Sequence, residues 1–334
     1  MTVIEVLAPG LLTTVQDLGR EGFGPMGVSP SGAADPIALR IGNRLVGNAE
    51  SAAALEMTLL GGVFLFPKGA LAALTGSDFG ATLDGADLPP WTSFKVKPGQ
   101  TLRLGPTRSG ARCYLCTQGG IAVQPFLGSA STHLLSGLGG YEGRALRKGD
   151  VLKMGDSAIP GCSSYSSRAL STSRCKKVTP KILERLLPRK VLRVTAGPQS
   201  GWFSQAAEKV LYGATYQVSE EANRMGLRLH GPPLPEGGHG AMISEGVSLG
   251  AVQIAAGGMP IILFVEQQTT GGYAKMANVI SADFSSLGQL RPRDEIRFER
   301  ATFETARNLL LEQETLLAAK DLIVETTGDR KGPL

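Results

Sequence analysis

The sequence has few of the residues that catalytic and metal sites most often use. Its 334 residues include only three histidines and four cysteines, and aromatic residues make up 6%. His133, His230 and His239 are too scattered for the spacing of a zinc protease or a catalytic dyad. Cys113 and Cys116 form a C-x-x-C motif, but their odd offset on a predicted strand sends the two thiols to opposite faces. The sequence therefore predicts no metal site.

Long apolar runs are also missing. Every apolar stretch is interrupted by Gly, Pro or a charged residue well before the ~18 residues that a membrane-spanning helix needs. The N-terminus, MTVIEVLAPG, lacks a basic region followed by an apolar core, so no signal peptide is expected. These absences predict a cytoplasmic protein.

Two common motifs of nucleotide and nucleophile sites are absent. The sequence contains no G-x-x-x-x-G-K-[ST] phosphate loop and no G-x-S-x-G nucleophile elbow. The chain is therefore not expected to hold nucleotide phosphates in such a loop of its own.

Glycine, by contrast, is abundant at 44 residues, and proline adds 20. Both fall singly or in pairs between short apolar runs, which is typical of short strands joined by tight turns. The length allows two domains. We predict a mainly β protein built from two small barrels or sandwiches. The predicted strands are residues 2–7, 53–60, 63–66, 70–74, 101–104, 112–117, 191–195, 215–218, 225–229, 250–254, 261–265 and 278–280.

Capping residues and apolar spacing predict three helices. Asp35 caps a helix that starts at Pro36 and stops at Gly47, and Ser204 caps a second that stops at Gly213. A third is expected at about residues 302–320, with an apolar stripe packed on a barrel. The stripe consists of Phe303, Ala306, Leu310 and Leu317.

The net charge of +5 is concentrated in one stretch. Between Ser173 and Val194 there are eight Lys and Arg residues and one Glu. No aromatic residues interleave with these bases, so a stacking platform for single-stranded nucleic acid is not expected. Together with the Ser-rich segment before it, this composition predicts a domain boundary. The predicted units are an N-terminal domain at 1–170, a basic linker at 171–190 and a C-terminal domain at 191–334.

Polar residues gather at several predicted strand ends. QDLGR offers Asp17 and Arg20, and SPSGAAD offers Ser31. In NRMGLRL, Arg224 and Arg228 share a face if both lie on the strand. The planar guanidinium group of arginine can bind a carboxylate or phosphate ligand through two parallel hydrogen bonds. Surface salt bridges made by these two arginines are an open alternative.

The segment QTTGGYAK, residues 268–275, allows several interpretations. A phosphate loop is excluded because the lysine does not directly follow glycine and no hydroxyl residue follows it. A biotin-bearing lysine is disfavoured because Ala274 stands where that motif has Met. A tight hairpin and an anion site remain. In the second case Gln268 and Thr270 share a strand face, and Gly271 and Gly272 let a ligand oxygen approach backbone amides.

Seven motifs together resemble a known family. They are TTVQDLGR, GVSPSGAAD, GGIAVQPFLGSAST, GLGGYEGRALRKGD, NRMGLRLHGPPLP, QTTGGYAK and GQLRPRDEIRF. Their content and order resemble the C subunit of 5-oxoprolinase, the KipA-like, biotin-dependent carboxyltransferase-like family, also called allophanate hydrolase subunit 2. The resemblance runs from about residue 3 to residue 298. The chain departs from the family pattern at Ala34, Gln267 and Arg293, where Met, Arg and Gly are usual.

The resemblance implies two cyclophilin-like β-barrel domains with a few short helices and a C-terminal helix. It places the family's site near the Asn-Arg pair and the Gly-Gly-aromatic-x-Lys segment. Lys275 and Arg224 are the expected catalytic residues, while a solvated Lys275 and a Tyr273 that only packs in the wall are the alternatives. With the polar strand-end residues added, the expected substrate-binding residues are Asn223, Gln253, Gln268, Thr270, Gly271, Gly272, Tyr273, Asp17, Arg20 and Ser31.

The function that the resemblance implies is ATP-dependent opening of 5-oxoproline to L-glutamate. The expected partners are a KipI-like B subunit and a LamB/YcsF-like A subunit, and ATP is handled with them. One alternative is the carboxyltransferase component of a biotin-dependent urea or amide carboxylase, with biotin on another chain. The other is a KipA-like regulatory protein that binds and antagonises a KipI-like kinase inhibitor. Neither nucleic acid nor a membrane is an expected partner.

Overall fold

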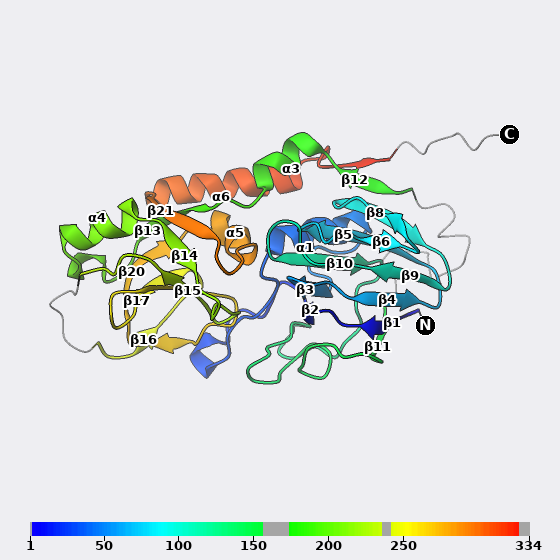
Figure 1. The fold of residues 1–334 in the computed structure, drawn as a ribbon, viewed down its shortest axis with the longest axis horizontal. Helices are drawn as coiled ribbons and strands as arrows, with labels where there is room; N and C mark the ends of the chain where they lie inside the picture. Colours follow the sequence, from blue (N-terminus) through cyan, green and yellow to red (C-terminus); the bar gives the residue numbers. More distant parts are fainter. Residues whose placement is uncertain (1, 156–173, 236–241, 327–334) are drawn as a thin grey trace.

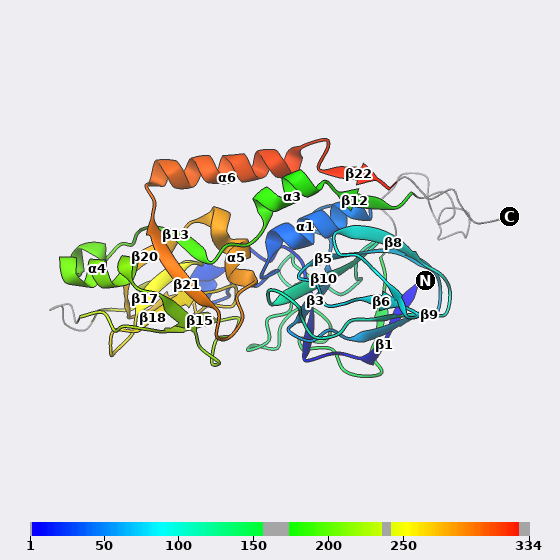
Figure 2. The ribbon, with the colours of Figure 1, turned by 45° about the horizontal axis from the view of Figure 1, so that its top comes forward.

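The computed structural model describes residues 2–155, 174–235 and 242–326, which form two β units side by side with a helix along one edge (Figures 1 and 2). The Ser-rich segment 157–173 and His239 lie outside the described residues. In the described part of the chain, no helix has the length and apolar character to cross a membrane. The prediction of a mainly β fold is confirmed.

The first unit consists of two sheets. The six-stranded sheet runs in the order β11 (Val151–Lys153), β1 (Val3–Ala8), β4 (Val63–Phe66), β9 (Gln100–Arg103), β6 (Thr82–Leu83) and β7 (Ala86–Asp87). The seven-stranded sheet runs in the order β2 (Leu12–Gln16), β3 (Ala54–Thr58), β10 (Arg112–Thr117), β5 (Ala70–Gly76), β8 (Thr92–Val96), β12 (Lys176–Val178) and β22 (Ile323–Glu325).

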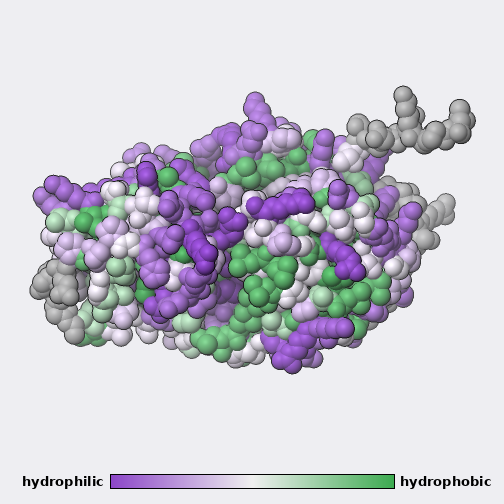
Figure 3. Space-filling model, in the orientation of Figure 1, coloured by the Kyte–Doolittle hydropathy of each residue, from purple (hydrophilic) through white to green (hydrophobic). Residues whose placement is uncertain are grey.

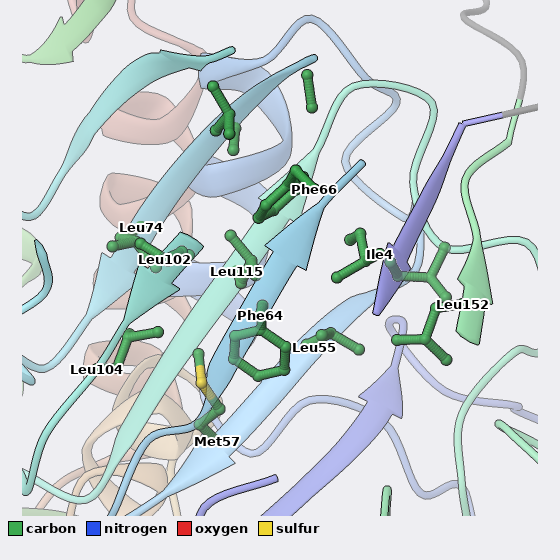
Figure 4. Close-up of a cluster of buried hydrophobic side chains, with 14 of the residues drawn as sticks. Ile4, Leu55, Met57, Phe64, Phe66, Leu74, Leu102, Leu104, Leu115 and Leu152 are labelled. Atoms are coloured by element: carbon green, nitrogen blue, oxygen red, sulfur yellow. The ribbon is translucent and has the colours of Figure 1, made fainter. Parts of the chain in front are cut away.

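The core of the first unit lies between these sheets (Figure 4). Phe64 of β4 and Leu55 of β3 are fully buried in it. Along β10, Cys113 faces this core, whereas Cys116 faces a second apolar cluster on the other side of the sheet. The predicted opposite orientation of the two thiols is therefore confirmed. Burial raises the pKa of both thiols.

Two helices cover the outer face of the seven-stranded sheet. The first is α1 (Pro36–Leu45), capped as predicted by Asp35, whose side chain accepts a hydrogen bond from Ala38 N at 3.0 Å. The second is α3 (Pro180–Leu186), which buries Ile182 and Leu186 in the same cluster. The segment expected to be a basic linker thus contributes α3 and the strand β12 to the first unit, because apolar side chains alternate with its bases.

The second unit is a closed seven-stranded barrel. Around the barrel, the order is β13 (Val191–Ala196), β20 (Ala274–Val279), β17 (Ala251–Ile254), β18 (Pro260–Leu263), β15 (Gly226–His230), β14 (Tyr216–Val218) and β21 (Glu295–Arg300). A two-stranded ribbon, β16 (Glu245–Gly246) and β19 (Thr270–Gly271), lies outside it. The remaining helices are η1 (Gly24–Met26), η2 (Ser200–Trp202), α4 (Gln205–Gly213), η3 (Ser281–Asp283), α5 (Phe284–Gly288) and α6 (Phe303–Ala318).

The helix α6 has the predicted bounds and contacts β13 and η3 of the second unit, but its predicted apolar stripe is only partly buried. Thr302 caps it by accepting a hydrogen bond from Thr305 N at 3.1 Å. The prediction that the apolar stripe is buried is wrong at the start of the helix, where Phe303 is 73% exposed. Leu317, at the other end, is buried in the cluster under α1. The helix therefore spans from the barrel to the first unit (Figure 2), and the strand β22 that follows it joins the first unit's sheet.

Gln289, just after α5, ties the two units together. Its Oε1 accepts hydrogen bonds from Ser77 Oγ at 2.8 Å and from Arg112 N at 2.9 Å, and its Nε2 donates to Asp35 Oδ2 at 2.8 Å. The side chain is 5% exposed. Buried polar groups of this kind hold the units in one arrangement because each would be costly to leave unpaired.

Candidate functional site

Lys275 and Gln253 are cross-strand neighbours on the barrel. They are paired in register between β20 and β17, next to a register shift at Val252, and their exposed fractions are 2% and 1%. Directly opposed residues of an antiparallel pair point to the same face of the sheet. Asn278 pairs with Ala251 in the same ladder, and its position relative to Gln253 places it on that face as well. Three polar side chains thus lie on the same face of the β17–β20 pair.

The ammonium group of Lys275 lies beside a carboxylate. Its Nζ is 2.5 Å from Glu245 Oε1, in an ion pair whose angles do not make a regular hydrogen bond. Gln199 Nε2 donates to the same Oε1 at 2.7 Å, and Lys275 N donates to Gln199 Oε1 at 3.1 Å. The contacts with Lys275 and Gln199 lower the pKa of Glu245. Lys275 is therefore held as a buried cation, which contradicts the alternative of a solvated lysine.

Several buried polar atoms at this place lack a partner. Gln253 Nε2 and Asn278 Oδ1 make no hydrogen bond within the described residues, and Lys275 Nζ has only its ion pair. An unsatisfied buried polar group costs about 1–3 kcal/mol. The three atoms offer two donors and one acceptor, which is the pattern that an amide or a carboxylate-bearing ligand would satisfy. We call this group, Lys275, Gln253 and Asn278, the lysine pocket.

The β16–β19 ribbon covers the lysine pocket. A Cβ on Gly271 would lie 2.7 Å from Gln253 Nε2 and 3.0 Å from Gln268 Nε2. A side chain at this position would therefore push the Gln253 amide aside, although the φ of Gly271 is not positive. Beyond it, Gly272 and Tyr273 are exposed, with Tyr273 at 45%. Thr270 is exposed and pairs with Gly246.

The expectation of a tight hairpin at QTTGGYAK is wrong. The strands β18 and β20 both pair with β17, so they are not neighbours in the barrel. The connection between them must pass across β17, and its middle part, β19, pairs with β16 instead. This crossing is what brings Gly271 over Gln253.

Arg224 lies at the seam between the two units. Its Nη1 is 2.5 Å from Glu56 Oε1 of the first unit, and its Nη2 donates to Gly32 O at 2.7 Å. Its Nε donates to Glu266. Tyr114 OH donates to Glu56 Oε2 at 2.6 Å. All of these side chains are buried, so the guanidinium neutralises two carboxylates that close the seam.

The residues beside Arg224 do not extend this network. Asn223 is exposed, and its Oδ1 accepts from Met225 N at 2.8 Å, which shapes the turn before β15. Arg224 precedes β15, so it does not share a strand face with the exposed Arg228. Within the described residues, Lys275 and Arg224 bind different carboxylates, and no contact joins them.

Asp17, Arg20 and Ser31 form a separate buried cluster in the first unit. Asp17 accepts from Ser129 Oγ and Ser131 Oγ, both at 2.6 Å. Arg20 Nη2 donates to Ser131 O, while its Nη1 and the hydroxyl of Ser31 have no partner in the described residues. Ser31 has a φ of 55°, a conformation that few non-glycine residues adopt. The structure thus groups the predicted site residues around Lys275, Arg224 and Asp17, and the last two groups adjoin because Arg224 binds the carbonyl of Gly32, next to Ser31.

Sequence reasoning missed Glu245 and Gln199. Glu245 lies 30 residues before its ion-pair partner in a segment with no periodic pattern, and Gln199 precedes the 3-10 helix η2. Only the pairing of β16 with β19 brings Glu245 over β20. In the described part of the chain, no group of three or more His, Cys, Asp or Glu side chains could hold a metal ion.

Comparisons with known proteins agree on one family. The family model described as carboxyltransferase domain, subdomain A and B, matches residues 26–300. The C subunit of the Escherichia coli 5-oxoprolinase is 37% identical over 93% of this chain and 96% of its own length. The urea amidolyase of Saccharomyces cerevisiae is 34% identical over 96% of this chain, but this region is 18% of its length.

Solved structures give the same result. The protein in the crystal structure of TTHA0988 is 36% identical in sequence to this chain, and the two structures have a TM-score of 0.75. The match covers 90% of this chain and 55% of the TTHA0988 chain. The Kluyveromyces lactis urea amidolyase is 31% identical with a TM-score of 0.84, covering 96% of this chain and 21% of that one. The chain therefore spans about half of the first of these proteins and about a fifth of the second.

Proposed function

The chain belongs to the family of carboxyltransferase domains with subdomains A and B, and from this premise we propose that it is one component of an ATP-dependent 5-oxoprolinase. In this role it opens 5-oxoproline to L-glutamate together with partner subunits in the cytoplasm. The observation that carries the proposal is the coverage of the relatives. The similarity extends over 96% of the C subunit of the Escherichia coli 5-oxoprolinase, but over 18% of a urea amidolyase.

The lysine pocket supports an amide or lactam substrate. 5-Oxoproline carries a ring carbonyl, a ring N–H and a carboxylate. Lys275 Nζ and Gln253 Nε2 are donors for the oxygens, and Asn278 Oδ1 is an acceptor for the N–H. Opening the ring breaks its C–N bond, adds water at the carbonyl carbon and returns a proton to nitrogen. A buried ammonium group stabilises the negative charge that develops on the lactam oxygen.

Glu245 stands where a substrate carboxylate can bind. Its Oε1 accepts from Gln199 and pairs with Lys275, although the side chain is 47% exposed. An exposed carboxylate of this kind can be displaced at small cost, because ion pairs with a solvent-exposed partner contribute little to stability. We infer that the substrate carboxylate replaces Glu245 and keeps the charge of Lys275 compensated.

The proposed partners are a KipI-like B subunit and a LamB/YcsF-like A subunit. The name of the Escherichia coli relative, which designates it as one subunit of 5-oxoprolinase, supports an assembly of several chains. This chain lacks a G-x-x-x-x-G-K-[ST] loop, so we propose that ATP is used by the assembly and that the isolated chain hydrolyses little of it.

A carboxyltransferase role is the second candidate. It is favoured by the TM-score of 0.84 to the Kluyveromyces lactis urea amidolyase, and in this role biotin would be carried by another chain. One assay separates the candidates. The chain is purified with its co-expressed partner subunits and supplied with ATP and either 5-oxoproline or urea with bicarbonate. Glutamate release from 5-oxoproline is expected, whereas ATP consumption only with urea and a biotin carrier would overturn the proposal.

A further inference from the structure

A cavity of about 490 Å³ lies at the seam between the two units. None of the residues that line it belongs to the lysine pocket. Its walls come from the end of β5, the turn before β8, the loop after β9, the segment after α3 and the residues around α5. On the face shown in Figure 3, hydrophilic side chains gather on the barrel side of the seam and apolar ones on the other. The volume is within the range of about 300–1,000 Å³ that is typical of small-molecule sites.

Cationic side chains from both units face this cavity. They are Arg108, Arg189, Lys190 and Arg291. Arg189 and Lys190 belong to the basic stretch, whose charge has no role in the lysine pocket. The side chain of Arg189 is 41% exposed and its ion pair is a long one, at 3.9 Å from Glu299. Its guanidinium is therefore available to an anion.

The other three cations have carboxylate partners but remain accessible to a ligand. Arg108 lies 3.1 Å from Asp78 and its side chain is 69% exposed. Asp294 is shared between Lys190 at 3.0 Å and Arg291 at 3.5 Å. The three cationic side chains are 69%, 62% and 36% exposed, so a ligand with several negative charges can reach them beside their carboxylates.

Asp35, the remaining carboxylate of the cavity wall, is held by the protein. Its two oxygens accept hydrogen bonds from Ala38 N and Gln289 Nε2, and the residue is 3% exposed. Burial raises the pKa of its carboxyl group. The four cations of the cavity outnumber its three carboxylates, Asp35, Asp78 and Asp294.

The lining of the cavity also includes apolar residues and an aromatic ring. Trp91 lies there with Pro90, Leu187 and Leu290. Trp91 has a φ of 59°, which is strained for an aromatic residue. The surrounding strands fix it, because Trp91 N donates to Leu74 O at 2.7 Å and Trp91 O accepts from Val178 N at 3.0 Å. Strain held in this way is typical of ligand sites.

We propose that the seam cavity binds a nucleoside polyphosphate, with the base against Trp91 and the phosphates against Arg108, Arg189 and Arg291. Flat bases stack on indole rings, and guanidinium groups bind phosphate oxygens in pairs. The inference rests on the proposed function, which requires ATP. In this proposal the basic stretch contributes to nucleotide binding, and the chain binds the nucleotide through the cavity residues instead of a phosphate loop.

The test uses the fluorescence of Trp91 in the full chain. The sequence has two tryptophans, so Trp202→Phe leaves Trp91 as the single reporter. We expect ATP to change this fluorescence saturably, and adenosine and inorganic triphosphate each to bind at least about tenfold more weakly, which corresponds to 1.4 kcal/mol. Replacing Arg189 and Arg291 together by Ala should weaken ATP binding at least about tenfold. Arg228→Ala, an exposed arginine away from the cavity, is the matched control.

Three results would overturn the inference. They are no saturable response to ATP, a double variant that binds ATP like the control, and inorganic triphosphate that binds as tightly as ATP. The proposed function is tested separately, by glutamate release from the assembled subunits. If ATP does not bind in the cavity while the assembly still opens 5-oxoproline, only this inference fails. If ATP binds and 5-oxoproline is not opened, the proposed function fails instead.

Discussion

Glu245 Oε1 lies 2.5 Å from Lys275 Nζ, although only one of the two side chains is buried. The side chain of Lys275 is 3% exposed and that of Glu245 is 47% exposed. The charge of the lysine is therefore compensated from outside the barrel, by a carboxylate on a ribbon whose strands have two residues each. This arrangement leaves the ammonium group in place when the carboxylate is exchanged for that of a ligand.

Glu245→Gln should strengthen substrate binding in the assembled enzyme. The amide cannot compete with a substrate carboxylate for Lys275, so we expect KM for 5-oxoproline to fall about two- to fivefold, in line with an exposed ion pair. The value of kcat should change by less than about twofold, because Glu245 has no role in the bond-breaking step. Steady-state kinetics measure both values. Glu208→Gln, which changes a half-buried carboxylate that pairs with Arg300, is the control. A higher KM in Glu245→Gln would show that the carboxylate helps to bind the substrate.

The same ion pair predicts a dependence of stability on pH. The pKa of Glu245 is lowered from 4.5 in the folded chain by Lys275 and Gln199. A lowered pKa stabilises the fold above the unfolded value, and this contribution is lost as pH falls through the folded value. The difference in Tm between wild type and Glu245→Gln should be present near neutral pH and disappear well below pH 4.5. A difference that stays constant across this window would exclude the ion pair as its cause.

Gly271→Ala should impair activity more than stability. The added methyl group would meet Gln253 Nε2 at 2.7 Å, and this amide is the end of a side chain that can turn away. We expect Tm to change little and kcat/KM to fall at least about tenfold, because one donor of the lysine pocket is displaced. Gly272→Ala is the matched control, since its Cβ would have only ordinary contacts, at 3.5 Å from Met242 O and Ser244 Oγ. Equal activities in the two variants would argue against a role of Gln253.

Arg224→Ala should act mainly on stability. It leaves Glu266 without its arginine and Glu56 with only Arg112, at 3.6 Å, in the buried seam, and breaking a buried pair in this way costs about 3–5 kcal/mol. Denaturant unfolding measures the loss, and Arg228→Ala, whose side chain is 56% exposed, should cost less than about 0.5 kcal/mol. Adding Glu56→Gln to Arg224→Ala should recover part of the loss. An unchanged free energy of unfolding with lost activity would instead favour the catalytic role expected from the sequence.

Local signals allowed much of the fold to be predicted. Asp35 followed by Pro36 determines where α1 begins, and Ser204, which accepts from Ala207 N at 3.2 Å, determines the start of α4. The alternation along β10 explains the opposite faces of Cys113 and Cys116. These features depend on residues close in the sequence, so a single chain is sufficient to recognise them.

The site depends on contacts that no local pattern carries. Arg224 meets Glu56, 168 residues away, only because the two units pack together. Lys275 meets Glu245 only because the connection from β18 to β20 crosses β17 and pairs with β16. An arginine near a glycine-rich turn has the same appearance whether it binds a substrate or closes a seam. The choice between these roles required the three-dimensional neighbours.

The central claim is that Lys275 is a catalytic group, and Lys275→Met tests it most directly because methionine keeps most of the length of the side chain without its charge. The measurement is glutamate formation from 5-oxoproline and ATP by the chain assembled with its partner subunits, together with the Tm of the chain. We predict a loss of about 30- to 1,000-fold in kcat/KM, which corresponds to about 2–4 kcal/mol of transition-state stabilisation. Tm and partner binding should be nearly unchanged, and Lys209→Ala, an exposed lysine on α4, should match wild type. Lys275→Met with the activity of the wild type would contradict the account.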